Sequence, residues 1–391
     1  MNKPLLMKIV KIVAIVLVCI IVVAGSISIG LWEYAKDVYF VNKEDNVAFQ
    51  QEHLRYLREE YYQNYVSLGE QRFCNFDLEE LLNSGVKYNE VAFLATHNSY
   101  QRKVTDTTLE FQLPFKILSL GLKNFNKNTF ENNTLTEQFE SGIRSIEIDV
   151  EAREENGNVT FTVMHKPVFD SATTCFDFEG ALEEIIMWSE HNPNHLPISI
   201  IIEAKQDVAP LDGLNIFSLE HTDAFDNLLK EKLGEKLITP NDMLGVHSTF
   251  KEMRENDDWM PLKDMLGKIV VILHENKMTE DYVEKDESLR TQAMFPSLLY
   301  KDRNEDYACI IIDNNPKKTI LRDEDLQENN FLVRTRADSY PKSSEARYSL
   351  TEQVRSQIIT TDFCPRTVRN DEHTYSFNGY TVKLLWEKYG A

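Results

Sequence analysis

Two carboxylates spaced two residues apart, Glu147 and Asp149, are the side chains of this sequence whose type and spacing most directly suggest chemistry. They alternate with apolar residues in the run Arg144–Val150. Side chains in a strand alternate between faces, so the two carboxylates would share a face, with Cα atoms roughly 7 Å apart. Like charges this close are costly inside a fold unless a cation or a proton offsets them. The pair therefore indicates either a cation site or the solvated face of an edge strand.

The element that carries this pair is one of eight short apolar runs, several of them β-branched, separated by stretches compatible with helices. The expected strands are Val91–Thr96, Ser145–Val150, Phe161–Met164, Ile198–Ile202, Ile269–Leu273, Cys309–Ile312, Phe331–Val333 and Gln357–Ile359. Runs of this kind suit parallel strands buried on both faces. They predict an α/β fold, a (β/α)8 TIM barrel of regular or irregular form. A doubly wound open sheet is the alternative, but no glycine-rich turn follows the first run.

Each run begins apolar and ends polar, and in a barrel all of these ends open on one face, where active sites are built. The first set of side chains expected there consists of Asn98, Glu147, Asp149 and Glu203. This all-oxygen set suits calcium or magnesium rather than zinc. The second set is a histidine pair, His97 and His165, on strands expected to be neighbours. Beside a cation, one ring can handle a proton while the other neutralises developing charge, which suits phosphoryl transfer.

The N-terminal region precedes these motifs and differs from them in composition. Residues 12–31 form an uncharged run long enough to span a bilayer, and Lys3, Lys8 and Lys11 precede it. We therefore expect residues 1–35 to be a cytoplasmic N-terminus with a single-pass cell-membrane anchor, leaving the rest extracytoplasmic. A signal peptide that is cleaved to secrete the chain is the alternative. Residues 36–85 are expected to form a helical stalk or packing segment, and residues 86–391 the catalytic domain.

The overall composition limits the classes of partner. The chain of 391 residues has a net charge of −21, and its pI near 4.9 argues against nucleic-acid binding. No feature indicates a protein partner. An oxidising exterior would permit disulfides among Cys74, Cys175, Cys309 and Cys364, but the sequence does not pair them.

The ordered motifs resemble a known enzyme family. Those of the first half are Thr96–Tyr100, Ile146–Asp149, Val163–His165 and Ile201–Glu203, which resemble the X-region of phosphatidylinositol-specific phospholipase C. Those of the second half are Val333–Asp338, Glu345–Arg347 and Gln357–Phe363, which look like the bacterial calcium-dependent subfamily. The resemblance covers roughly residues 88–365.

The resemblance implies a TIM barrel that binds one calcium ion and a phospholipid substrate at a membrane. The implied calcium ligands are Asn98, Glu147, Asp149 and Glu203. In the family reaction, the inositol 2-hydroxyl attacks the phosphodiester to give diacylglycerol and inositol 1,2-cyclic phosphate. By similarity, His165 would be the general acid for the diacylglycerol oxygen, and His97 would steady the phosphoryl charge. Calcium would lower the pKa of the hydroxyl and bind a phosphate oxygen.

Four further side chains are expected to bind substrate: Arg334, Arg336, His274 and Lys205. The two arginines are the best cationic candidates for the phosphate or the inositol hydroxyls. Which of them faces the pocket stays open, and ion pairing with barrel carboxylates is an equally weighted interpretation. Animal members of the family place lysines on their fifth strand, near the position of His274 here. This departure favours plain phosphatidylinositol over phosphorylated headgroups.

Two other functions compete with this hypothesis. Glycerophosphodiester phosphodiesterases share the barrel, an early histidine, an E-x-D pair and a second histidine. That family usually has arginine after the first histidine, where this chain has Asn98. A non-catalytic, surface-anchored lipid binder is the second competitor. The presence of both histidines together with all four candidate ligands argues against it.

Overall fold

The chain folds around a closed parallel barrel. The computed structural model describes residues 3–118, 131–206, 210–339, 345–364 and 374–385, with side chains described from residue 25 onward except residue 27. The barrel order is β1-β11-β10-β9-β8-β7-β4-β2, and β2 pairs with β1 to close the ring. The strands are β1 (Val91–Thr96), β2 (Ser145–Glu155), β4 (Ile198–Ala204), β7 (Ile269–Leu273), β8 (Phe295–Leu298), β9 (Ile310–Ile312), β10 (Leu332–Arg336) and β11 (Ile358–Thr361). This closed ring of eight parallel strands confirms the predicted barrel.

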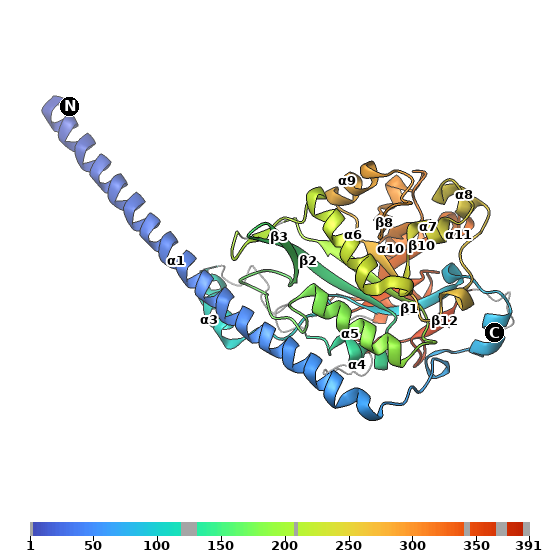
Figure 1. Ribbon diagram of the computed structural model, residues 1–391. Coiled ribbons are helices and arrows are strands. Elements are labelled where there is room, and N and C mark those ends of the chain that lie inside the picture. Colours follow the sequence, from blue (N-terminus) through green and yellow to red (C-terminus); the bar gives the residue numbers. More distant parts are fainter. Residues whose placement is uncertain (1–2, 119–130, 207–209, 340–344, 365–373, 386–391) are drawn as a thin grey trace.

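Short strands and helices surround the barrel (Figure 1). The additional strands are β3 (Asn158–Val163), β5 (Leu214–Asn215), β6 (Leu237–Ile238) and β12 (Val382–Leu384). The first helices are α1 (Lys3–Glu59), α2 (Leu78–Asn83), α3 (Asp106–Leu118), α4 (Leu135–Glu140), α5 (Phe178–His191) and α6 (Leu219–Leu233). The later ones are α7 (Pro240–Leu244), α8 (Phe250–Glu255), α9 (Lys277–Lys285), α10 (Pro316–Ile320), α11 (Asp323–Glu328) and α12 (Glu345–Glu352).

One expected barrel strand lies outside the barrel, and one barrel strand escaped prediction. Residues 161–163 of the run Phe161–Met164 belong to β3, which pairs antiparallel with the extended end of β2 as a hairpin. The turn is Asn156-Gly157, and both residues have positive φ, the conformation that a tight hairpin turn requires. The fifth barrel strand is instead β8, whose four residues include Pro296. Proline cannot donate a ladder hydrogen bond, so it hides a strand from pattern-based prediction.

The alternation expected for β2 is present. Ile146, Ile148 and Val150 are fully buried and pack into the layer between strands and helices. Glu147 and Asp149 therefore face the barrel interior, with exposed fractions of only 2% and 0%. The edge-strand interpretation of this pair is wrong, because β2 has a barrel neighbour on each side, β4 and β1.

Helix α1 contacts α3 and α5 over its C-terminal half and extends beyond the barrel at its N-terminal end (Figure 1). The expected membrane span, residues 12–31, lies within this helix, but the side chains up to residue 24 are outside the described set. In the part of the chain that the structure describes, no helix is both long enough and apolar enough to cross a membrane. The predicted single-pass membrane localisation is therefore wrong.

The four cysteines whose side chains the structure describes lie in the core. Cys74, Cys175 and Cys309 are buried thiols outside any disulfide, and Cys364 is also buried. Burial raises the pKa of the Cys74 and Cys309 thiols to about 12, so they remain protonated at neutral pH.

Candidate active site

Three carboxylates converge at the barrel mouth. Glu147, Asp149 and Glu203 offer oxygen atoms that all lie within 4.8 Å of one another. β2 and β4 bring them together because Asp149 is directly opposite Glu203 in the parallel register. Lys205 donates to Asp149 Oδ2 at 2.8 Å and to Glu203 Oε1 at 3.0 Å. The ammonium group of Lys205 therefore offsets part of the repulsion between these carboxylates.

The environment of Asp149 fits a cation site. Burial, followed by the neighbouring Glu203, raises the pKa of Asp149 to about 6, although Lys205 and His165 oppose the shift. Its Oδ1 atom is buried without a hydrogen bond of good geometry among the described residues, and so is the nearby Tyr100 hydroxyl. A buried carboxylate oxygen without a well-formed hydrogen bond, among further carboxylate oxygens, is the arrangement that a hard divalent cation satisfies. The residues present therefore fit a calcium ion.

Arg334 sets the charge state of Glu147. Its buried guanidinium donates to Glu147 Oε2, to Asn314 Oδ1 at 2.5 Å and to Thr360 Oγ1 at 2.9 Å. Burial alone would raise the pKa of Glu147, but Arg334, with help from His97, lowers it to about 2. Glu147 is therefore ionised at neutral pH, and one of the two expected substrate arginines is engaged with a barrel carboxylate.

Arg334→Met should destabilise the calcium-free protein by about 3–5 kcal/mol, because it leaves the buried Glu147 carboxylate without its cation. Urea unfolding in the presence of a chelator measures this change. Arg303→Met removes a much more exposed pair with Asp325 and should cost no more than about 1 kcal/mol. Equal losses for the two variants would contradict the assigned importance of the Arg334–Glu147 pair.

His97 follows β1 and is held by groups from β10 and the end of β11. Its Nδ1 atom lies 2.8 Å from Asp362 Oδ1, and its Nε2 atom lies 3.6 Å from Glu147 Oε1. Arg336, the second expected substrate arginine, is 3.1 Å from Asp362 Oδ2 and 3.2 Å from His97 Nδ1. Because a carboxylate only accepts, the hydrogen of this contact lies on Nδ1, while Nε2 is turned toward Glu147 and lies 3.4 Å from Arg336 Nη1.

His165 follows β3, yet it still reaches the mouth. The hairpin returns the chain so that Val163 pairs with Val150, one residue beyond Asp149. The Nδ1 atom of His165 donates to Asp170 Oδ2 at 2.8 Å. Burial opposes protonation, but Asp170 and Asp149 raise the pKa of His165 above its usual value. The ring is thus held in one orientation and keeps its proton to a higher pH.

Asn98 and His274 complete the expected set. Asn98 is buried directly after β1 with a φ of 44°, a conformation that asparagine tolerates, and its carbonyl accepts from Asn132 Nδ2 at 2.9 Å. Ser99 then joins β1 to β2: its amide donates to the Glu147 carbonyl, and its hydroxyl accepts from the Glu147 amide. His274 follows β7 and donates to the Glu275 carbonyl at 3.3 Å.

Sequence reasoning missed the residues that orient the two histidines. Asp362 was visible as a polar strand end, but nothing in the sequence pairs it with His97, 265 positions away. Asp170 lies in a loop five residues after His165 and carries no periodic signal. The hairpin that delivers His165 had a signal, because Asn-Gly between two extended runs is typical of a tight turn.

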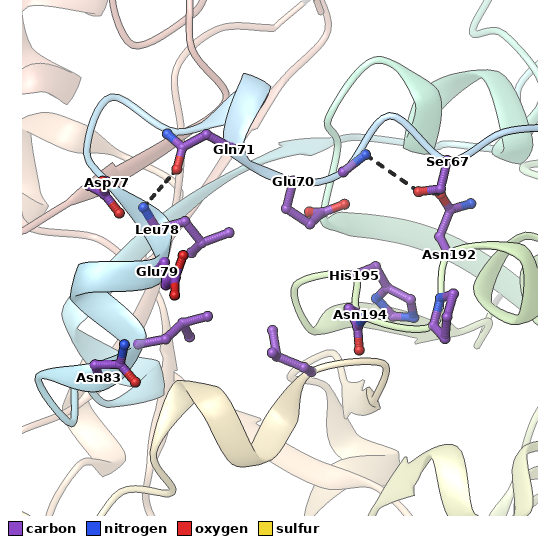
Figure 2. Close-up of a pocket in the computed structure, with 14 residues that line it drawn as sticks. Ser67, Glu70, Gln71, Asp77, Leu78, Glu79, Asn83, Asn192, Asn194 and His195 are labelled. Atoms are coloured by element: carbon purple, nitrogen blue, oxygen red, sulfur yellow. Dashed lines mark hydrogen bonds between the residues drawn. The ribbon is translucent and has the colours of Figure 1, made fainter.

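A separate pocket lies at the opposite end of the barrel (Figure 2). Its volume is about 830 Å³, and its lining includes His195 and Leu266, which precede β4 and β7. Its two buried titratable groups have partners: Glu70 accepts from Arg144, and His195 Nε2 lies 2.8 Å from Ser189 Oγ. Burial lowers the pKa of His195 to about 4, so the ring is neutral. These contacts indicate a structural region rather than a second reaction centre.

The fold and the mouth chemistry together define a TIM-barrel enzyme with paired histidines and a carboxylate cluster. Residues 153–389, more than half of the chain, match the family described as phosphoinositide phospholipase C, Ca2+-dependent. The chain belongs to this family, and it is a calcium-dependent phosphodiesterase of the phospholipase C type. This confirms the resemblance seen in the motifs, although those around His97 and Glu147 precede the matched residues.

Solved structures agree in fold. A calcium-dependent phosphoinositol-specific phospholipase C from Pseudomonas sp., a Gram-negative bacterium, superposes with a TM-score of 0.55 and 16% identity, covering 81% of this chain and 99% of that one. A calcium-dependent phosphatidylinositol-specific phospholipase C from Streptomyces antibioticus gives 0.50 and 17%, covering 71% and 95%. No curated protein sequence matches this chain closely enough to count as a relative.

Proposed function

We propose that this enzyme cleaves phosphatidylinositol-type lipids to diacylglycerol and inositol 1,2-cyclic phosphate, using His97 and His165 as its catalytic residues. The observation that supports this most strongly is the convergence of two carboxylate-held histidines with a three-carboxylate cluster at one barrel mouth. As part of the proposal, residues 86–391 are the catalytic domain.

Asn98, Glu147, Asp149 and Glu203 would hold one calcium ion. When bound, calcium supplies Lewis acidity that lowers the pKa of the inositol 2-hydroxyl and neutralises phosphate charge. One of these carboxylates would accept the proton of the 2-hydroxyl.

His165 would protonate the departing diacylglycerol oxygen. A general acid must hold its proton near the working pH, and Asp170 supports this by raising the pKa of the ring. Because Nδ1 donates to Asp170, the proton transferred to substrate comes from Nε2. His97, held by Asp362 beside Arg336, would stabilise the negative charge that develops on the phosphoryl oxygens.

A few cationic and polar side chains would recognise the headgroup. Arg336 is the stronger of the two arginine candidates for the phosphate, because Arg334 is fully buried and already paired with Glu147. Lys205 and His274 would face the inositol hydroxyls. Lysines of the kind that animal members use are not found at the His274 position, which favours a headgroup without additional phosphates.

Product analysis tests this function. With calcium, the protein should release diacylglycerol and cyclic inositol phosphate from phosphatidylinositol micelles, and a chelator should abolish the release. Equal turnover under chelation would contradict the metal requirement. Glycerol 3-phosphate as product would favour the glycerophosphodiester phosphodiesterase alternative, and binding without turnover would favour the non-catalytic lipid binder.

A further inference from the structure

Helix α1 presents a stripe of buried amide side chains to the barrel. Asn42, Asn46 and Gln50 recur at intervals of four residues, so they lie on one helix face. Their exposed fractions are 1%, 1% and 5%. Apolar residues would have sufficed to attach the helix, whereas buried amides require specific partners and therefore fix one placement.

The partners of these amides are mainly backbone groups of one segment, residues 171–177. Asn46 Nδ2 donates to the Ser171 carbonyl at 2.7 Å, and its Oδ1 accepts from the Thr173 amide at 3.1 Å. Gln50 repeats this pattern at Asp177, donating to the carbonyl at 2.9 Å and accepting from the amide at 2.8 Å. The two side chains thus hydrogen-bond the segment in the manner of a neighbouring strand.

Asn42 extends the same contacts to the chain that follows β1. Its Nδ2 atom donates to Ser171 Oγ at 3.0 Å and to Thr108 Oγ1 at 2.8 Å, and its Oδ1 accepts from Thr105 Oγ1 at 2.6 Å. The loop that follows His97 and the loop that follows His165 are therefore fastened to the same helix.

Residues 171–177 directly follow Asp170, the residue that orients His165. The two carboxylate oxygens of Asp170 accept from His165 Nδ1 at 2.8 Å and from Gln101 Nε2 at 2.7 Å. The backbone amide of Asp170 also donates to the Lys166 carbonyl, which completes a short loop around His165. A shift of the segment at Ser171 would thus move Asp170 relative to the ring.

A glycine in α5 leaves room for the Gln50 side chain. Gly180 lies in the first turn of α5, and a Cβ atom there would meet Gln50 Nε2 at 2.4 Å. That distance is shorter than any normal contact, so a larger residue would displace the Gln50 amide from Asp177. Both partners of this contact are therefore adapted to it.

We propose that α1 is a positioning element of the active site, in which Asn46 and Gln50 hold residues 170–177 so that Asp170 keeps His165 in its working orientation. The inference rests on the proposed role of His165. It assigns a function in catalysis to a helix that lies wholly outside the residues matching the family.

The test compares three full-length proteins with the wild type, on soluble short-chain phosphatidylinositol at saturating calcium. The double variant Asn46→Ala/Gln50→Ala should lower kcat by about tenfold with little change in KM, because small misplacements of a catalytic group reduce rate more than binding. Gly180→Ala should reproduce the direction of this change with the α1 sequence intact. Gln51→Ala, an exposed amide one position from Gln50, should behave as wild type.

The pH dependence separates positioning from simple loss of stability. The groups that act on the charge of His165 are Asp170, Asp149 and Lys205. With Asp170 displaced, the alkaline limb of the rate profile should move to lower pH, and the double variant should add no further shift in an Asp170→Asn background. Melting temperatures show whether each variant is folded. If the double variant Asn46→Ala/Gln50→Ala does not fold, the kcat and the alkaline limb of Gly180→Ala are compared with those of the wild type instead.

Two results overturn the inference. One is an unchanged kcat and alkaline limb in both the double variant and Gly180→Ala; the other is a lowered kcat with an unmoved limb and full additivity with Asp170→Asn. His165→Ala, measured in parallel, tests the proposed function separately. If His165→Ala retains full activity, the assignment of His165 fails. If it is inactive while the α1 variants are normal, only the inference fails.

Discussion

Replacing His165 with alanine should lower the rate of diacylglycerol release by about two to four orders of magnitude, the range for losing a general acid. The pKa of His165 is raised, and its Nδ1 atom is held by Asp170, so the ring is suited to donate a proton at the mouth. The initial rate of release from phosphatidylinositol micelles, with calcium in excess, measures the effect. Calcium affinity should stay the same, because His165 is not among the expected ligands.

His247→Ala is the matched control for this variant. His247 lies between α7 and α8, in the segment that precedes β7, so it is remote from the C-terminal strand ends that form the mouth, and its Nε2 atom lies 2.8 Å from Asp258 Oδ2. It should leave the rate unchanged. A His165→Ala enzyme that turns over at the wild-type rate would remove His165 from the mechanism.

Asp149→Asn should raise the calcium concentration for half-maximal activity by about 100-fold or more. Even residues that only support a metal ligand typically change affinity by 10–100-fold, and Asp149 is expected to be a ligand itself. The same change should alter the pH dependence of stability in calcium-free protein. The native state holds the Asp149 proton more tightly than the unfolded chain does, since its pKa rises from 3.8 to about 6. Wild-type stability should therefore fall as pH increases from about 4 to about 6.

Asparagine cannot ionise, so the variant should lack this part of the decline and melt higher than wild type at pH 7 without calcium. Thermal melts in chelator across pH 4–7, together with calcium titrations of activity, measure both effects. Asp313→Asn changes another buried carboxylate at a strand end, one that pairs with Arg322, and should leave the calcium requirement unaltered. An unaltered requirement in Asp149→Asn would exclude Asp149 as a ligand.

The barrel could be predicted because its signals are local. The runs that became β4 and β7 are continuous and β-branched, the run of β1 is continuously apolar up to Thr96, and that of β2 alternates. Their polar ends follow directly in sequence. The same polar ends drew attention to Glu147, Asp149 and Glu203, whose oxygens the structure brings within 4.8 Å. Alternation along a strand is sufficient to place these residues on one face.

The remaining features depend on contacts between distant residues. Arg334 meets Glu147 across 187 positions, and the orientation of His97 depends on Asp362. The strand that precedes His165 was assigned to the barrel because a hairpin strand and a barrel strand share the same apolar pattern. The role of Asn46 and Gln50 was invisible, because their partners in residues 171–177 are backbone groups, which leave no trace in the sequence. The partners of Asn42 are hydroxyl side chains at least 63 positions away, which no local pattern pairs with it.

The closure of the barrel also has a consequence for how the enzyme fails. β1 and β2 pair through the single residue pair Ala95–Ser145, whereas β2 and β4 pair through six. The line between β1 and β2 separates His97 from Glu147 and Asp149, and the hydrogen bonds of Ser99 to Glu147 span it. Partial opening along this line would pull the histidine away from the carboxylates while most of the ring stayed intact. In mild denaturant, the enzyme should lose activity before it loses its fold.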